Sequence, residues 1–207
     1  MKNLFLGLLI LLSAAGACAQ NDGYTRTYEV NHPNIPPSLD SVHLQVIGTN
    51  AYYQKVVKVD SNIRLSSIYT RTLEFMATKN FQQTYGYEQE GKLIFTTTQD
   101  LNENTEYNDS YDDDPEPYTV QFSIIIDMRN GRYRYTIRNV IFYLPTDNGN
   151  RKLSLYEIYQ KETSGDSRRI MKDARKLKDS FEKYLVSLTG ELYTEIEHKA
   201  PIYNSKF

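Results

Sequence analysis

Hydrophobic and polar residues alternate with a period of two on both sides of Asn130-Gly131. The segment 118–144 reads YTVQFSIIIDMRNGRYRYTIRNVIFYL. Asn-Gly between two β-rich runs is typical of a two-residue hairpin turn, because both residues tolerate the positive φ that this turn needs. The pattern therefore predicts an antiparallel hairpin in which Arg129 pairs with Arg132.

The predicted register divides the hairpin into one apolar and one polar face. On the polar face Asp127 lies opposite Arg134, and Ser123 lies opposite Arg138. This alternation is typical of an antiparallel sheet with one face buried, and a slip of one residue would exchange the two faces. The buried face is expected to consist of Val120, Ile124, Ile126, Ile137 and Ile141.

The alternation stops at Asn139. The five residues that follow, 140–144, are apolar on both predicted faces. A strand with this pattern either contains a β-bulge or is covered on both sides. We therefore expect a bulge near Asn139, or cover on both faces beyond it.

Two other stretches have the period of amphipathic helices. The first covers residues 65–81, with Ser66 or Ser67 as its N-cap and Arg71 outside its apolar stripe. This stripe consists of Leu65, Ile68, Tyr69, Thr72, Leu73 and Met76.

The second helix is predicted from Asp166 or Ser167, its alternative N-caps, to about Leu188, with Gly190 as its C-cap. Residues 191–207 are mostly polar and are interpreted as a C-terminal tail. The apolar stripe of this helix consists of Ile170, Ala174, Leu177, Phe181, Tyr184, Leu185 and Leu188.

The remaining patterns complete an α+β fold. The acidic segment 100–117 is predicted as a loop between two hairpins, and 146–151 as a turn. The order β-α-β-β-β-β-α predicts a two-layer sandwich, in which two helices pack on one face of an antiparallel sheet of about five strands. The further strands are 52–59, 83–89 and 92–98, with 41–47 as a strand or linker and 153–159 as an edge strand or helical turn.

Residues 1–19 have the features of a signal peptide. A basic residue precedes an apolar run too short to span a membrane, and Ala17-Cys18-Ala19 is a small-residue cleavage pattern. Cleavage there leaves Gln20 first and removes the only cysteine, so we expect an exported, periplasmic or secreted protein. The alternative is a lipoprotein anchored through a lipidated Cys18.

The mature chain is expected to contain one domain. Residues 20–40 are polar, include three prolines and are interpreted as a linker. Residues 41–190 form the predicted α+β domain. No run in the mature chain is long and apolar enough to predict a transmembrane helix.

Several of these segments together resemble an exported domain family of the Bacteroidota, which has a TBP-like fold and no established function. The segments are YYQKVVKVD, SSIYTRTLEFMA with Tyr69, GKLIF, and the hairpin with Gly-Arg-Tyr-Arg at 131–134. The resemblance covers residues 52–139 and implies a TBP-like arrangement and a place in the cell envelope. It implies no activity and no functional residues. The family's Trp midway along the first helix is replaced here by Phe75 or Met76.

Composition restricts the possible chemistry. The net charge of −2 does not favour nucleic-acid binding, which usually needs a basic patch. His32, His43 and His198 have no partner at a spacing typical of catalysis or metal binding. The segment 100–117 begins with the spacing of a calcium loop but lacks its Gly and its final Glu. We therefore predict no catalytic residue, no metal site and no cofactor.

The polar face of the hairpin is the candidate binding surface. An anionic glycan, a carboxylate or a loop of another envelope protein is its expected partner. The alternative is an ordinary solvated face, and a free sheet edge is a second route to partner binding or self-association. We therefore favour a non-enzymatic binding module over an extracytoplasmic hydrolase. The candidate residues are Arg132, Arg134, Arg138, Ser123 and Gln121.

Overall fold

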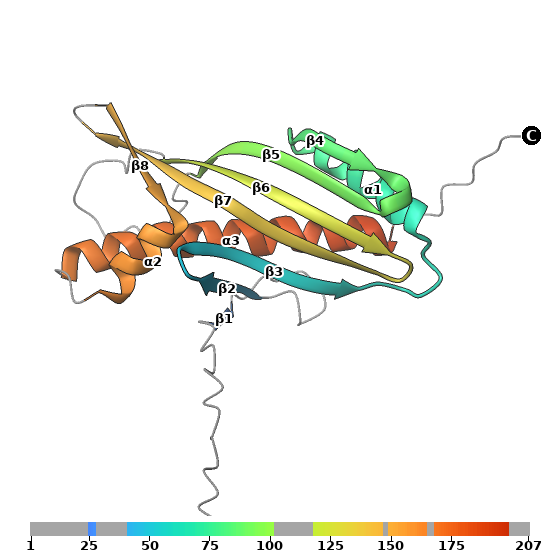
Figure 1. Cartoon of the computed structure of the whole chain (residues 1–207), viewed down its shortest axis with the longest axis horizontal. Coiled ribbons are helices and arrows are strands. Elements are labelled where there is room, and N and C mark those ends of the chain that lie inside the picture. Colours follow the sequence, from blue (N-terminus) through green and yellow to red (C-terminus); the bar gives the residue numbers. More distant parts are fainter. Residues whose placement is uncertain (1–24, 28–40, 102–117, 147–148, 165–167, 199–207) are drawn as a thin grey trace, which may run out of the picture.

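An antiparallel sheet of eight strands packs against three helices (Figure 1). The computed structural model describes residues 25–27, 41–101, 118–146, 149–164 and 168–198. The strands are β1 (Thr25–Thr27), β2 (Ser41–Ile47), β3 (Asn50–Lys58), β4 (Gln82–Tyr87), β5 (Lys92–Leu101), β6 (Tyr118–Arg129), β7 (Arg132–Thr146) and β8 (Gly149–Ser154). The helices are α1 (Leu65–Thr78), α2 (Leu155–Thr163) and α3 (Arg168–His198).

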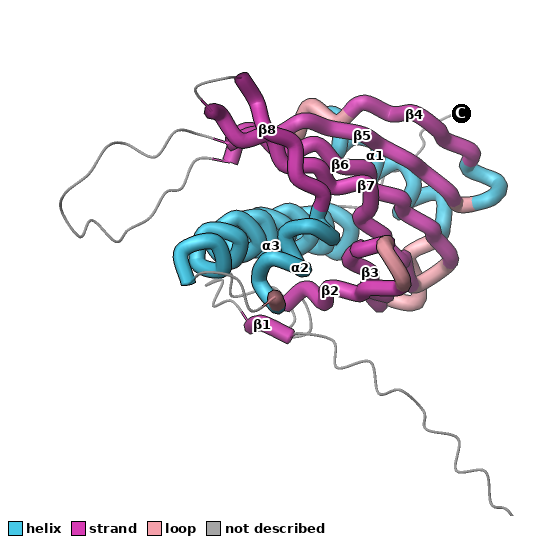
Figure 2. Tube along the Cα trace, turned by 60° about the vertical axis from the view of Figure 1, so that its left-hand side comes forward, coloured by secondary structure: helices cyan, strands magenta, loops and turns pink. Residues whose placement is uncertain are grey.

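The strands are ordered β1-β2-β3-β7-β6-β5-β4. The long strand β7 pairs with β3 over its first half and with β8 over its last residues, so both occupy the same edge of β7. Figure 2 shows the sheet curving around α3. The α+β class and the helices on one face are confirmed, because the inward side chains of the strands and the apolar stripes of the helices form one core.

The sheet has more strands than the predicted five. β1 lies inside the predicted linker 20–40 and pairs with β2, while β8 begins inside the predicted turn 146–151. Both strands lack the apolar alternation on which the prediction depended. They can be recognised as strands only from their pairing with β2 and β7 in the structure. The open alternatives are also decided: 41–47 is a strand, and 153–159 contains the end of β8 and the start of α2.

The predicted bulge at Asn139 is confirmed. Asn139 has a φ of 56°, in the left-handed region, and the β6–β7 register shifts between Gln121 and Ser123. One extra residue on β7 reverses which side chains face inward. Phe142 is therefore fully buried, and the prediction that Ile141 belongs to the buried face is wrong.

The N-terminus of α1 is capped from a distant part of the chain. Neither Ser66 nor Ser67 is the N-cap; the residue in that position is Arg64, which makes no capping hydrogen bond. The backbone N–H of Leu65 instead donates to the side-chain Oδ1 of Asn130, 2.8 Å away in the β6–β7 turn. The turn and the helix therefore hold each other in place.

Arg71 is buried, although the sequence pattern places it outside the apolar stripe of α1. Its guanidinium donates to the carbonyl oxygen of Ile196 in the last turn of α3. Carbonyls in this turn have no hydrogen-bond partner within the helix. A cation there is also attracted by the negative end of the helix dipole. Arg71 therefore links the two helices.

Helix α3 continues eight residues beyond Gly190, which is buried within the helix and does not end it. Leu192, Tyr193 and Ile196 extend the apolar stripe and are buried, so the residues up to His198 are not a tail. Glycine costs about 1 kcal/mol within a helix. Packing of three apolar side chains on the sheet exceeds that cost.

At the other end of α3, the prediction that Ile170 belongs to the buried stripe is wrong, because this residue is 42% exposed. Helix α2 packs beside this part of α3, with Glu162 forming a buried ion pair with Lys178. The alternative N-caps Asp166 and Ser167, like the predicted signal peptide with Cys18, lie outside the described residues.

Candidate functional site

The five predicted site residues lie on one face of the sheet, opposite the helices. Arg132, Arg134, Arg138 and Gln121 are exposed, and Ser123 is half-buried beside Arg138, its partner in the register. They do not form one cluster. Arg138 is six residues along β7 from Arg132, a separation of about 20 Å.

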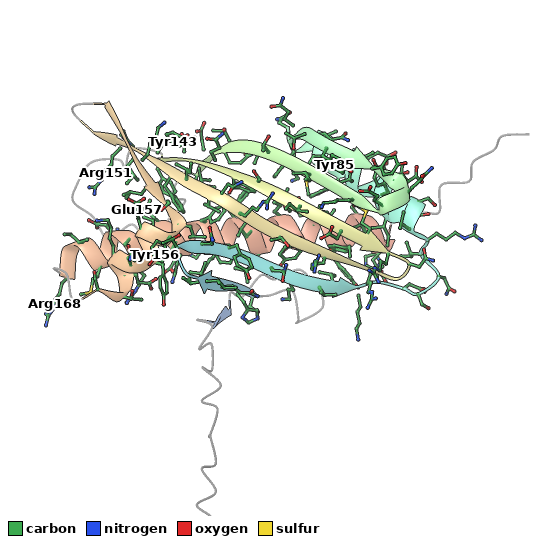
Figure 3. The ribbon with its side chains drawn as sticks, in the orientation of Figure 1. Tyr85, Tyr143, Arg151, Tyr156, Glu157 and Arg168 are labelled. Carbon is green, nitrogen blue, oxygen red and sulfur yellow. The ribbon has the colours of Figure 1, made fainter. Side chains whose placement is uncertain are left out.

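Gln121 lies still farther from the β6–β7 turn. Its side-chain oxygen accepts a hydrogen bond of 2.7 Å from the hydroxyl of Tyr143. Figure 3 shows Tyr143 near β8 and Tyr85 on β4, at opposite ends of the open face. The structure therefore divides the predicted site, and the end near the β6–β7 turn has the higher density of charge.

That end contains five cationic side chains. In the register Lys58 of β3 pairs with Arg132 of β7, and Arg132 pairs with Arg129 of β6. Opposed side chains on one sheet face are about 5 Å apart at Cβ, so these three cations form a row. Arg134 and Lys92 lie one row farther from the turn. We call the set Lys58, Lys92, Arg129, Arg132 and Arg134 the basic end.

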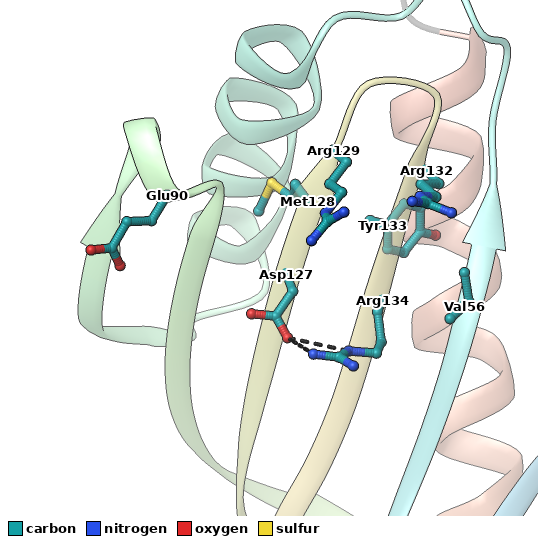
Figure 4. A pocket seen from close by; sticks show the side chains of 8 residues that line it. All are labelled: Val56, Glu90, Asp127, Met128, Arg129, Arg132, Tyr133 and Arg134. Atoms are coloured by element: carbon teal, nitrogen blue, oxygen red, sulfur yellow. Dashed lines mark hydrogen bonds and ion pairs between the residues drawn. The ribbon is translucent and has the colours of Figure 1, made fainter.

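Only part of this charge is neutralised by the described residues. Asp127 accepts two hydrogen bonds from Arg134, of 2.7 Å from one terminal nitrogen and 3.3 Å from Nε (Figure 4). Within the described part of the chain no ion pair involves Lys58, Arg129 or Arg132. Like charges placed side by side repel, so this row has an uncompensated positive field.

A shallow depression of about 290 Å³ lies over the basic end. Figure 4 shows the side chains of Asp127, Arg129 and Arg134 around it, with Glu90 on the β4–β5 connection at one side. Its two carboxylates are outnumbered by cations, and it contains no histidine. The depression therefore suits a small anionic group better than proton-transfer chemistry.

Backbone contacts hold the basic end in a fixed shape. The N–H of Gly131 donates to the carbonyl of Ile63 at 3.1 Å, and the N–H of Val59 donates to the carbonyl of Gly131 at 3.0 Å. Gly131 has a φ of 69°, and a Cβ there would lie 3.0 Å from the Cα of Ser61. The β6–β7 turn is thus fastened to the β3–α1 connection, which keeps the cations of three strands side by side.

Two exposed tyrosines on the edge strand β4 extend the surface. Tyr85 and Tyr87 are 41% and 46% exposed, and Tyr87 pairs with Lys92 of the basic end. The hydroxyl of Tyr85 donates to Glu90 at 2.9 Å, which raises the pKa of the tyrosine. Tyrosine and arginine are both enriched at protein interfaces.

Sequence reasoning did not select Lys58, Lys92, Arg129, Tyr85 or Tyr87. Each lies at a polar or aromatic position of a strand, with nothing local to distinguish it from a solvated side chain. These residues become neighbours across four pairs of adjacent strands. Which strands are adjacent depends on the order of strands in the sheet. Arg129 had the strongest signal, because the Asn-Gly turn already pairs it with Arg132.

A second depression, of about 340 Å³, lies between the β3–α1 connection and the end of α3. Asp60, Ser67 and His198 line it, which are the residue types of a nucleophilic triad. No hydrogen bond connects these three side chains in the described structure. The carboxylate of Asp60 instead accepts the backbone N–H of Asn62 at 2.8 Å, as in an ordinary turn.

Within the described ranges, no group of three or more His, Cys, Asp or Glu side chains is placed to hold a metal ion. None of the helices that the structure describes is both long and apolar enough to cross a membrane.

Comparison with known proteins identifies the domain. Residues 53–143 match the family described as a domain of unknown function (DUF4468) with TBP-like fold. The crystal structure of a TBP-like protein from Parabacteroides distasonis ATCC 8503 has a TM-score of 0.59 and 9% identity, covering 75% of this chain and 98% of that chain. A DUF4468 family protein from Bacteroides ovatus ATCC 8483 has a TM-score of 0.59 and 10% identity, covering 76% and 91%. No curated protein matches the chain. At this identity the two structures establish the fold alone.

Proposed function

We propose a function from the geometry of the open face, because the chain belongs, through residues 53–143, to the DUF4468 family with its TBP-like fold. That fold by itself assigns no activity. The chain is a non-enzymatic binding module, and its basic end takes an anionic partner. The partner is a protein or a glycan of the cell envelope.

The row of Lys58, Arg132 and Arg129 carries this proposal. Three cations on adjacent strands repel one another, and folding places them together although no carboxylate of the described residues forms an ion pair with them. A bound carboxylate, sulfate or phosphate group would relieve that repulsion and accept charge-assisted hydrogen bonds from two guanidinium groups. The fixed backbone beneath the row reduces the entropy lost on binding.

A hydrolase has less support. Such an enzyme needs a nucleophile, a base and an orienting group within hydrogen-bond reach of one another. Asp127 is already held by Arg134, and Asp60, Ser67 and His198 share no hydrogen bond in the described part. The binding module is therefore the better explanation of the charges that are present.

Binding of two fluorescent anionic probes tests the proposal. One probe is an oligoglutamate and the other a heparin-derived oligosaccharide, so the two arms distinguish a peptide from a glycan. We expect Arg129→Glu plus Arg132→Glu to weaken binding of the preferred probe at least tenfold at low ionic strength. Lys172→Glu plus Lys176→Glu, the same charge change on the exposed side of α3, should leave most of the affinity. Equal losses in both variants, or no binding to the wild type, would contradict the proposal.

A second candidate surface is the free edge of β4. All six of its residues are exposed and none is charged, whereas edge strands usually carry a Lys, a Pro or another protection against pairing. Strand addition by a partner, or by a second copy, would use this edge. Gln82→Lys plus Thr84→Lys should then abolish any association that persists at high salt, as measured by sedimentation velocity.

We further propose that the protein is exported, by cleavage after Ala19. The apolar run and the small-residue pattern of residues 1–19 support this proposal. The intact mass of the mature protein tests it. A chain that begins at Gln20 supports a periplasmic or secreted protein, whereas a lipidated Cys18 supports the anchored alternative.

A further inference from the structure

Negative charge is concentrated in the segment 102–117. It contains seven of the chain's 26 acidic residues and no Lys or Arg. The other residues therefore carry 24 basic against 19 acidic side chains, although the whole chain has a net charge of only −2. The acidic residues are Glu103, Glu106, Asp109, Asp112, Asp113, Asp114 and Glu116.

The ends of this segment are fixed far from the basic end. Leu101 and Tyr118 pair with each other where β5 ends and β6 begins. Arg129 is eleven residues along β6 from Tyr118, a distance of about 36 Å. The acidic segment and the basic end therefore emerge from opposite ends of the same two strands.

The densest part of the acidic segment, Asp112-Asp113-Asp114, cannot reach the row Lys58–Arg132–Arg129 of its own chain. Asp112 is six residues from Tyr118, so its Cα lies at most about 21 Å from that of Tyr118. Asp113 and Asp114 are fewer residues from Tyr118, so the chain lets them reach less far. A gap of about 15 Å to Arg129 remains, which exceeds what the two side chains span. The run Asp112-Asp113-Asp114 therefore meets the row Lys58–Arg132–Arg129 only in another molecule.

We propose that the basic end of one copy binds the acidic segment 102–117 of a second copy. This inference rests on the proposed function, because it names the anionic partner of the same surface. The contact is heterologous, joining two different surfaces, so it repeats from molecule to molecule and forms chains unless the geometry closes. Lys58, Arg129 and Arg132 supply the cations, and the run Asp112-Asp113-Asp114 supplies the carboxylates.

Charge complementarity selects this occupant. The row Lys58–Arg132–Arg129 spans about 10 Å across three strands, and three consecutive aspartates cover a similar length when extended. The exposed Tyr87 lies one strand beyond Lys92, where it can contact the apolar parts of a bound peptide. No specific side-chain pocket is required, since the field of the cations holds the segment.

Sedimentation velocity of the mature chain at several concentrations tests the inference. At about 0.01 M ionic strength, where the Debye length is about 30 Å, the weight-average mass should rise with concentration. At about 1 M, where the Debye length is about 3 Å, it should return to that of a monomer. Replacing the seven acidic residues by Asn and Gln should abolish the association, and so should Arg129→Glu plus Arg132→Glu. The Lys172→Glu plus Lys176→Glu control should still associate.

A synthetic peptide of residues 102–117 provides the direct measurement. We expect it to bind the wild-type chain and to lose at least tenfold in affinity with Arg129→Glu plus Arg132→Glu. A matched peptide with Asn and Gln in place of the carboxylates should not bind. A chain that stays monomeric at every concentration and low ionic strength overturns the inference, whatever the peptide does. If that monomer still binds the oligoglutamate or heparin-derived probe through Arg129 and Arg132, the proposed function stands and only the second copy is excluded.

Discussion

The two halves of the β6–β7 hairpin differ in how they use the same alternating pattern. Between the turn and Arg138, the register runs from Arg129 opposite Arg132 to Ser123 opposite Arg138, as the alternation predicts. Beyond Asn139 it is displaced by one residue, so that Gln121 lies opposite Ile141. The near half presents charge to solvent, whereas the far half sends an additional aromatic ring into the core.

One residue causes this difference. Asn139 takes the left-handed conformation, and the strand gains a residue without gaining a partner. Phe142 then packs edge-on against Phe181 of α3, with ring centroids 5.6 Å apart, and lies 6.3 Å from Tyr118. A local bulge thus decides which apolar residues become core in a strand where both faces are apolar.

Removing the aromatic ring of the far half should have the largest effect. Phe142→Ala should lower the free energy of unfolding by about 3–5 kcal/mol, because it leaves a cavity in the core. Ile141→Ala, on the half-exposed face, should cost less than half as much. Urea denaturation of both variants measures the comparison. Equal costs, or a larger cost for Ile141→Ala, would place the bulge elsewhere.

The conformation of the bulge gives the next largest effect. Asn139→Val should destabilise by about 1–2 kcal/mol, because a β-branched residue disfavours positive φ. Asn139→Gly should be neutral or slightly stabilising, since glycine adopts this conformation freely. Thermal unfolding distinguishes the two. A loss in both variants would mean that the asparagine side chain, rather than its backbone, stabilises the bulge.

Along β7, the near half should also be the more sensitive to alkaline pH. Burial raises the pKa of Tyr133 well above its usual value, and its hydroxyl has no hydrogen-bond partner among the described residues. Above pH of about 10 the unfolded chain loses this proton while the folded chain keeps it, so stability falls as the pH rises. Tyr133→Phe should remove the part of this fall in stability that is due to Tyr133. At neutral pH it should stabilise the protein by about 1 kcal/mol, because it removes a buried hydroxyl without a partner.

Urea denaturation at pH of about 7 and 10.5 measures this change. Tyr87→Phe is the control, because Tyr87 is exposed and its hydroxyl is hydrogen-bonded to Gln89. The interpretation is wrong if Tyr133→Phe destabilises the protein at neutral pH, since the hydroxyl would then have a stabilising partner. On β7, the inward residues of the far half, Val140 and Phe142, contain no group that titrates.

The turn that ends the near half is predicted to have a smaller effect. Asn130→Gly removes the side-chain oxygen that caps α1 and leaves Gly131, the turn residue with a positive φ, unchanged. We expect a loss of about 0.5–1 kcal/mol and faster amide exchange at Leu65. Ser66→Ala is the control, because Ser66 makes no cap. An equal loss in the control would show that α1 is capped from within its own sequence.

The smallest effect should come from the open face of the near half. Arg134→Ala plus Arg138→Ala should change the free energy of unfolding by less than about 1 kcal/mol, because exposed ion pairs contribute little. The melting temperature measures this change. A large drop would show that these arginines face the core. The same variant should weaken binding of the anionic probes less than Arg129→Glu plus Arg132→Glu. The alanine variant only removes two positive charges, whereas the glutamate variant replaces two positive charges by negative ones.

Parts of the fold follow from local pattern, and parts do not. The pairs of the near half, the hairpin around Gly91 and most of the α3 stripe could be predicted, because neighbours in the sequence fix them. β1, β8 and the last two turns of α3 could not, because packing by distant elements stabilises them. Arg71 shows the limit clearly: by helical period it is a surface residue, but the end of α3 gives it a buried carbonyl partner.

The candidate site divides in the same way. Arg132, Arg134 and Arg138 share a face because side chains alternate along any strand, and the sequence alone determines that. The concentration of acidic residues in 102–117 is likewise a property of the sequence. Only the tertiary structure decides that Lys58 joins Arg129 and Arg132, and that Asn130 caps a helix 65 residues away. Stereochemistry acts between neighbours, whereas the partners of a strand or helix end are selected by the packing of the whole chain.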